Sequence, residues 1–220
     1  MNHSSLGSAL ALGAVIALLS TSQVAALPLL SEVYYDASGS DDGFVFVEIS
    51  GQPGASLTGF TIEGVNGTDG SITGTLLLMG QVGADGLFVV ADLASAGGTS
   101  VVGADQLLNF DFQNGPDSVV LRDASGNVVD ALGYGSFGSG QTFAGEGTAA
   151  SDAPAGSSLA RHDGWADTDD NAFDFGELAV PTPGSAPGVP VPEPSQLGFL
   201  IGLLLARPIA VRCAWWRSSR

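Results

Sequence analysis

The chain has 220 residues, enough for one domain of ordinary size with processing segments at its ends. It contains 23 acidic residues, six arginines and no lysine, and the body between Leu27 and Val191 has a formal charge of about −20 (22 negative, two positive). Such a body repels nucleic-acid phosphates and anionic membrane surfaces, which argues against nucleic-acid binding and leaves cations or basic partners as favoured ligands.

Residues 1–26 are predicted to be a secretory signal peptide with a helical apolar stretch. This stretch runs from about Ala9 to Leu19, a polar break follows, and Val24-Ala25-Ala26 offers small side chains at the spacing that signal peptidases require. We therefore expect the protein to be exported. The single cysteine, Cys213, lies near the C-terminus, so no intramolecular disulfide can support the exported body.

The body is a series of short β-like runs separated by clusters of Gly, Asn, Asp and Ser, which favour turns. Strands are expected near Leu29–Tyr35, Phe44–Ser50, Gly59–Glu63, Thr75–Met79, Leu87–Ala91, Leu107–Phe112, Ser118–Arg122 and Val128–Leu132. The body shows no sustained 3.6-residue apolar period that would indicate a helix. This pattern predicts an all-β protein, an antiparallel β-sandwich over residues 27–184.

Several segments of the body resemble lamin-tail domains. The matches to the opening strands of that family are Ser31-Glu32-Val33, Phe46-Val47-Glu48-Ile49 and Leu57-Thr58-Gly59-Phe60-Thr61-Ile62. Residues 117–135 are similar to its later hairpin, and residues 156–184 to its closing segment. The resemblance implies an immunoglobulin-like sandwich, the same class that the strand pattern predicts. It implies no chemistry, because bacterial members occur on exported proteins as accessory or attachment modules.

A Pro-rich composition begins near Pro181 and indicates an extended stalk, with residues 185–196 as the linker. Residues 197–220 form an apolar segment, expected to be helical over 197–206, and an arginine-rich tail. This arrangement resembles the PEP-CTERM sorting signal. The motif residues are Val191, Pro192, Glu193 and Pro194, and the basic cluster consists of Arg212, Arg217 and Arg220.

The charge pattern of this tail suggests how it would act. An apolar segment followed by arginines would stop in the inner membrane with the arginines on the cytoplasmic side. The resemblance implies that an exosortase-type membrane protease then processes the chain. We therefore expect transient anchoring in the inner membrane, followed by a location at the cell surface or outside the cell.

No catalytic residue is predicted, although two groups of side chains superficially resemble catalytic sites. Glu32 and Glu48 interrupt apolar strands, but each could point to solvent or accept hydrogen bonds at a strand edge. Ser157 or Ser158, His162 and Asp163 lie within seven residues, too close in sequence for a typical hydrolase triad, whose members usually come from distant segments.

Calcium is the one cofactor that the sequence suggests. The segment HDGWADTDDNAFDF contains the candidate ligands Asp163, Asp167, Asp169, Asp170 and Asp174. Clustered carboxylates on loops suit calcium, although the spacing is not that of an EF-hand. The alternative is that these side chains cap turns and bind backbone amides. A second acidic loop spans Asp36–Asp42.

These observations favour an exported, non-enzymatic interaction or structural module of the cell surface or extracellular matrix. Its expected partners are an exosortase-type protease and a surface polysaccharide or protein ligand. Two alternatives remain: a small secreted metal-dependent hydrolase, and an adhesion module stabilised by calcium.

Overall fold

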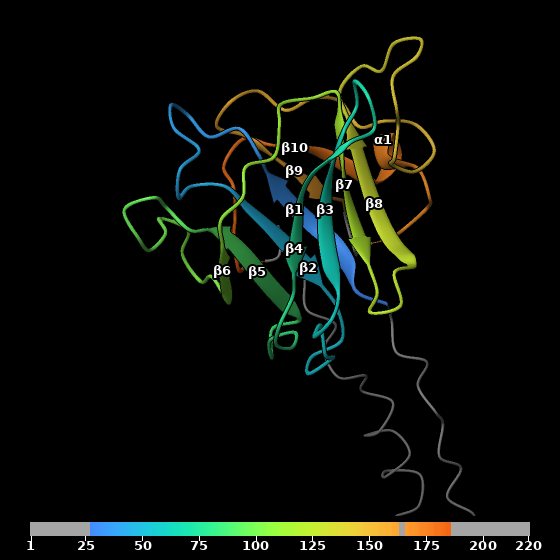
Figure 1. The fold of residues 1–220 in the computed structure, drawn as a ribbon. Coiled ribbons are helices and arrows are strands. Elements are labelled where there is room, and N and C mark those ends of the chain that lie inside the picture. The colour runs from blue at the N-terminus through green and yellow to red at the C-terminus, as the bar shows by residue number, and fades with distance from the viewer. Residues whose placement is uncertain (1–26, 163–165, 186–220) are drawn as a thin grey trace, which may run out of the picture.

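Two β-sheets pack face to face in the computed structural model, which describes residues 27–162 and 166–185 (Figure 1). The larger sheet has the order β10 (Phe175–Leu178), β9 (Ser158–Arg161), β1 (Leu29–Tyr34), β2 (Phe46–Ser50), β5 (Leu87–Asp92) and β6 (Gln106–Leu108). The smaller sheet has the order β4 (Ile72–Leu77), β3 (Thr61–Asn66), β7 (Asp117–Arg122) and β8 (Val128–Tyr134). The prediction of an all-β sandwich is confirmed.

Helix is almost absent from this part of the chain, where α1 (Asn171–Asp174) forms a single turn. All eight predicted strands exist, with ends that differ by a few residues. The four-residue strands β9 and β10 were not predicted. The helices expected within residues 1–26 and 197–206 lie outside the described residues.

One strand pair departs from the predicted antiparallel arrangement. β5 and β6 are parallel, whereas the other paired strands are antiparallel. Residues 93–105 connect this pair and are numerous enough for the crossover that parallel strands need. The predicted strand over 107–112 ends at Leu108, and beyond it the N–H of Phe110 donates to Asp92 Oδ1 (3.0 Å).

The main hydrophobic core lies between the sheets. Alternate residues of β2, such as Val47 and Ile49, face alternate residues of β7, such as Val119 and Leu121, and all are fully buried. Burial of a side chain of this size stabilises the fold by roughly 1.5–3 kcal/mol. Because one face of each strand packs into this core, the side chains of the opposite face are left for contacts with loops and solvent.

The outer face of the larger sheet is also covered, because every residue of β2 and of β5 is buried. Val101, from the β5–β6 connection, packs with Phe46 and Val89 on this face. The segment that follows β10 also returns across it, and we call residues 181–185 the strap. Central strands covered on both faces can hold polar side chains away from water.

The side chain of Gln106 links two edge strands, β6 of the larger sheet and β4 of the smaller sheet. Gln106 Nε2 donates to the carbonyl of Leu77 (2.9 Å), and Gln106 Oε1 accepts the N–H of Met79 (3.0 Å). The amide of Gln106 thus occupies a donor and an acceptor of the β4 edge, as a neighbouring strand would.

Candidate functional site

Calcium was predicted for the acidic segment around α1. Two carboxylates of this segment accept local hydrogen bonds. Asp170 is the N-cap of α1, and its carboxylate accepts the N–H of Ala172 (3.2 Å). Asp174 accepts both the N–H and the hydroxyl of Thr168 (2.9 and 2.7 Å). Asp163 lies outside the described residues. The turn-capping alternative therefore accounts for Asp170 and Asp174.

Arg161 on β9 organises the buried side of this segment. Its guanidinium forms two 2.8 Å hydrogen bonds with the carboxylate of Asp130 on β8, and it donates to Asp174 at 3.1 Å. Its Nε donates to the carbonyl of Leu30 (3.0 Å), and its Cζ lies 4.4 Å from the centre of the Phe175 ring. The Arg161 side chain is fully buried, so these partners supply the interactions that water would otherwise give.

Asn171 attaches α1 to the smaller sheet. Its side chain is fully buried, and Oδ1 accepts the N–H groups of Gly133 and Glu146, each at 2.8 Å. Its Nδ2 donates to the carbonyl of Ala131 (2.7 Å). Three backbone groups of the interior therefore depend on this one side chain.

Sequence reasoning missed the roles of Arg161, Asp130 and Asn171. One signal was available, because Arg161 is one of only two arginines between Leu27 and Val191, where there is no lysine, and it follows the apolar pair Leu159-Ala160. A lone cation beside an apolar run, in so acidic a body, indicates a buried ion pair. Its partner Asp130 could not be identified, because the sequence does not show which strands are neighbours.

Beside Arg161, the carboxylate oxygens of Asp130, Glu146 and Asp167 all lie within 4.8 Å of one another. Glu146 Oε2 is shielded from solvent and receives no hydrogen bond from the described part of the chain. Burial, and then the charges of Asp130, Asp167 and Asp169, raise the pKa of Glu146 to about 8. Three such carboxylates offer oxygen ligands suited to calcium. Of the predicted ligands, Asp167 belongs to this group, whereas Asp169 is exposed beside it.

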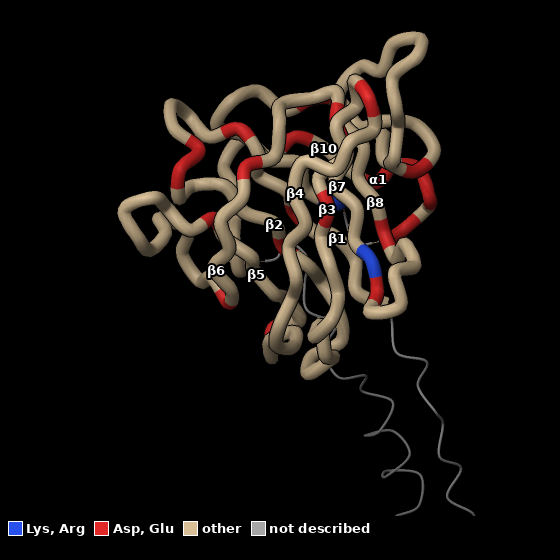
Figure 2. Tube along the Cα trace, viewed as in Figure 1, with Lys and Arg blue, Asp and Glu red and all other residues tan. Residues whose placement is uncertain are grey.

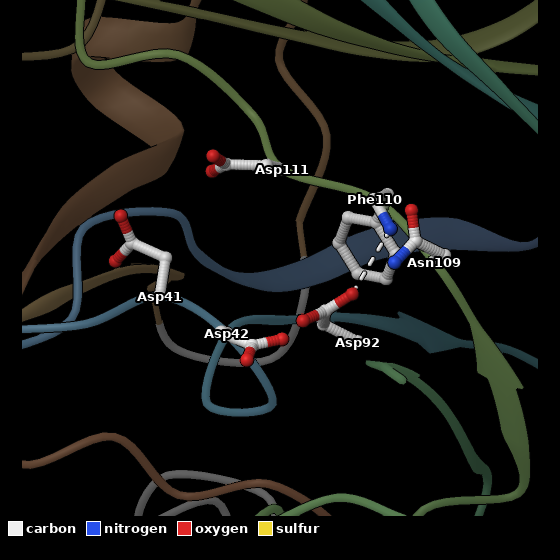
Figure 3. A pocket seen from close by; sticks show the side chains of 6 residues that line it. All are labelled: Asp41, Asp42, Asp92, Asn109, Phe110 and Asp111. Atoms are coloured by element: carbon white, nitrogen blue, oxygen red, sulfur yellow. Dashed lines mark hydrogen bonds between the residues drawn. The ribbon is translucent and has the colours of Figure 1, made fainter. Parts of the chain in front are cut away.

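A second acidic site is an open cavity of about 170 Å³ at the other predicted loop (Figure 3). Its lining consists of Asp41, Asp42, Asp92, Asn109, Phe110 and Asp111. The buried Asp92 accepts the N–H groups of Gly43 (2.6 Å) and Phe110 (3.0 Å), while the exposed Asp42 accepts from Ser95. Acidic residues also mark the neighbouring loops (Figure 2). The negative potential at this end of the sandwich attracts cations and basic groups.

Glu32 and Glu48 lie directly opposite each other on the central strands β1 and β2, and both are fully buried. Ser158 donates its hydroxyl to Glu32 Oε1 (2.6 Å), and Ser31 donates to Glu48 Oε1 (2.8 Å). The pKa of Glu48 is raised to about 7, mainly by burial and to a smaller extent by the negative charge of the neighbouring Glu32. Both side chains accept hydrogen bonds, as one sequence-based alternative proposed, but neither points to solvent or lies on an edge strand.

The strap supplies the remaining partners of these two carboxyl groups. Thr182 donates its N–H to Glu32 Oε1 (3.0 Å) and its hydroxyl to Glu32 Oε2 (2.9 Å). Gly184 donates its N–H to Glu48 Oε2 (2.8 Å). The strap therefore crosses first β1 and then β2, held by side chains that extend from the middle of the sheet.

A turn ends the strap. The N–H of Ser185 donates to the carbonyl of Thr182 (3.0 Å), with Pro183 second and Gly184 third in the turn. Gly184 has φ of +71°, which a type II turn requires at this position and glycine adopts readily. The stalk expected from about Pro181 is thus attached to the sheet through residue 185.

The strap also forms one wall of an uncharged groove of about 470 Å³. Tyr34, Phe44, Phe46 and Val101 are among the other lining residues, and Phe44 is 48% exposed. None of the lining residues carries a charge, whereas acidic residues recur in other loops of the chain (Figure 2). Such a groove suits an uncharged ligand that has apolar faces.

The residues considered for a hydrolase have other contacts. Ser158 donates to Glu32, and Ser157 donates to Glu177 (3.0 Å). His162 is exposed and lines an open cavity with Phe173. Within residues 27–162 and 166–185, no hydrogen bond joins His162 to either serine.

The sorting residues lie outside the part of the chain that the structure describes. These are Val191, Pro192, Glu193, Pro194, Arg212, Arg217 and Arg220. Across residues 27–162 and 166–185, no helix has the length and apolar character needed to cross a bilayer. Export, processing and anchoring therefore stay predictions.

A scan against protein-family models and a search of curated proteins both find no match for this chain.

Proposed function

We propose that this protein is an exported, non-enzymatic interaction or structural module of the cell surface or extracellular matrix. The observation that carries this proposal is the use that the fold makes of its buried polar side chains. The side chains that join strands, loops and the strap through internal hydrogen bonds are Glu32, Glu48, Asp130, Arg161 and Asn171. Buried polar side chains that hold the elements together suit a rigid scaffold whose surface contacts a partner.

We further propose that the sandwich is of the immunoglobulin-like, lamin-tail type. The arrangement of the resembling segments supports this assignment. Residues 31–33 lie on β1, residues 46–49 on β2, and residues 57–62 lead into β3. Residues 117–135 include the β7–β8 hairpin, which pairs with β3. The segments thus belong to the connected elements of one sandwich.

Export and sorting can be tested on the protein that its native host produces. We expect the mature chain to begin near Leu27 and to lack the cluster Arg212–Arg220, because the signal peptide and the tail are removed. A Pro192→Ala, Pro194→Ala double variant should retain the tail and remain in the membrane fraction. Mass spectrometry of the mature termini, combined with cell fractionation, measures both outcomes.

Pro190→Ala is the matched control, since it changes a stalk proline outside the Pro-Glu-Pro triplet and should be processed like the wild type. Intact Arg220 on protein recovered from the culture medium would refute the sorting signal. Equal processing of the double variant and the control would show that the motif has no role.

The second candidate function is a calcium-stabilised adhesion module. It is favoured by Glu146 Oε2, a buried oxygen that receives no hydrogen bond from residues 27–162 or 166–185. Asp130 and Asp167 place two further carboxylates beside it. The guanidinium of Arg161 already neutralises part of this charge, because it lies 2.8 Å from Asp130 and 3.5 Å from Asp167. Calcium would therefore bind mainly through Glu146 and Asp167.

Calcium at ten times its Kd should raise the melting temperature by about 4 °C, because ligand binding to the folded state alone stabilises it by about 1.4 kcal/mol. Magnesium, which requires a smaller octahedral site, should have little effect. Glu146→Gln should abolish the response, while Asp69→Asn, which removes an exposed carboxylate on another loop, should preserve it. A melting curve that calcium leaves unchanged would eliminate this candidate.

A further inference from the structure

The uncharged groove beside the strap presents an aromatic ring to solvent. Phe44, in its lining, is exposed, although phenylalanine is among the residues most often buried. Its N–H donates to the carbonyl of Asp41 (2.9 Å), and the carbonyl of the preceding Gly43 accepts the N–H of Ser100 (2.8 Å). Gly43 also donates its N–H to the buried Asp92 (2.6 Å). The backbone that carries this ring is therefore fixed before a ligand arrives, which lowers the entropy cost of binding.

Apolar surface continues from Phe44 into the groove. Tyr34 and Phe46 form a tilted ring pair with their centroids 5.8 Å apart, and Val101 packs with Phe46. Val102, also in the lining, is exposed. A ligand that covers these side chains removes apolar area from water, so the ligand needs an apolar face of its own.

The strap forms a wall of this groove on which every backbone N–H is already committed. Pro181 and Pro183 have no N–H. The N–H groups of Thr182, Gly184 and Ser185 bind acceptors within the protein at 2.8–3.0 Å. This wall can therefore accept hydrogen bonds through its carbonyl groups, but its backbone cannot donate one. A ligand that binds here must bring its own donors, and an added peptide strand, which needs both kinds of backbone group, is disfavoured.

The distribution of charge restricts the ligand further. No residue that lines the groove is charged, whereas Asp41 and Asp42 lie just before Phe44 and line the acidic cavity. These carboxylates repel anionic ligands, and a cationic ligand would find its counter-charges in the acidic cavity and not in the groove. The ligand that fits is therefore uncharged, has an apolar face and carries many donors.

Two kinds of uncharged ligand pack on aromatic rings. A Pro-rich peptide has apolar faces but few N–H groups, so it cannot supply the donors that the strap requires. A pyranose ring combines a face of C–H groups with hydroxyl donors around its rim. The committed N–H groups of the strap thus favour the sugar.

We propose that the uncharged groove binds a neutral polysaccharide, with a sugar ring stacked on Phe44 and sugar hydroxyl groups donating to the carbonyl groups of Pro181 and Pro183. The groove thereby serves the interaction module of the proposed function, on which this assignment rests. Its volume of about 470 Å³ lies within the range of ligand sites, roughly 300–1,000 Å³.

Titration calorimetry of the full chain tests the site with neutral hexasaccharides of glucose, mannose, galactose and xylose as probes. At least one should bind with a Kd below about 1 mM. Raising the salt concentration from about 50 mM to about 500 mM should leave the affinity unchanged, because the ligand has no charge. Phe44→Ala should weaken binding about tenfold, since stacking and apolar contact are lost.

Phe44→Tyr keeps the ring and should bind like the wild type. Phe173→Ala is the matched control, because Phe173 is also exposed but lies on α1 and does not line the groove. We expect it to retain the wild-type affinity. Equal losses in Phe44→Ala and Phe173→Ala would overturn the site.

Failure of all four hexasaccharides to bind would also overturn the proposal. Tighter binding of a galacturonate hexasaccharide or of a proline decapeptide would do the same, because the groove would then accept an anion or a peptide. Hexasaccharide recovered intact after the titration is the expected result, whereas shortened products would support the site and contradict the non-enzymatic function. A chain that is exported and processed but binds no hexasaccharide would eliminate this assignment and leave the proposed function standing.

Discussion

Replacing Arg161 with methionine should lower the free energy of unfolding by about 3–5 kcal/mol, because the substitution leaves charges buried without a partner. Asp130 and Asp174 are both buried, and each loses a hydrogen bond to the guanidinium. The carbonyl of Leu30 loses its contact with Nε as well. Equilibrium denaturation with urea measures the change.

Arg122→Met is the matched control, since it removes the other arginine of the body. Arg122 pairs with Glu63 at 2.7 Å, but its side chain is 30% exposed, so we expect a loss below about 1 kcal/mol. Equal losses in the two variants would show that Arg161 does not hold the interior together. A double variant, Arg161→Met with Asp130→Leu, should recover part of the loss because it removes the unpaired carboxylate as well.

Asn171→Ala should cost about 3 kcal/mol of stability, because it deprives two buried backbone groups and one half-buried backbone group of their partner. The N–H groups of Gly133 and Glu146 lose an acceptor, and the carbonyl of Ala131 loses a donor. Urea denaturation measures the stability. Faster hydrogen exchange at Gly133 and Glu146 would locate the defect.

Asn127→Ala provides the comparison, because Asn127 is exposed and its side chain donates to Asp123 in the same turn (2.9 Å). We expect that variant to differ from the wild type by no more than about 0.5 kcal/mol. If Asn171→Ala were equally mild, water would have to replace all three hydrogen bonds at the site.

The sequence predicted the positions of the strands better than it predicted which strands pair with each other. Turn residues and short apolar runs revealed β1 to β5, β7 and β8, because these signals are local. β9 and β10 escaped notice because four residues give too short a pattern. The parallel direction of β6 could not be predicted, because it depends on how the long connection over residues 93–105 folds and not on the residues of β6.

The candidate sites depended still more on contacts between distant residues. The acidic loops were visible in the sequence, but Glu146 joins Asp130 and Asp167 only after folding. Glu32 was noticed as an unusual residue, yet its partner Thr182 lies 150 positions away. Residue type therefore indicated where polar groups would be buried, whereas the sandwich determined which groups would meet.

The side chain of Gln106 has a consequence for how copies of this protein meet. An exposed strand edge offers free N–H and C=O groups, on which the strand of another molecule can assemble. At the end of β4, the carbonyl of Leu77 and the N–H of Met79, two residues beyond the strand, are already bound to Gln106. A strand of a neighbouring molecule that approaches this end of β4 would therefore have to displace Gln106 before its backbone could pair there.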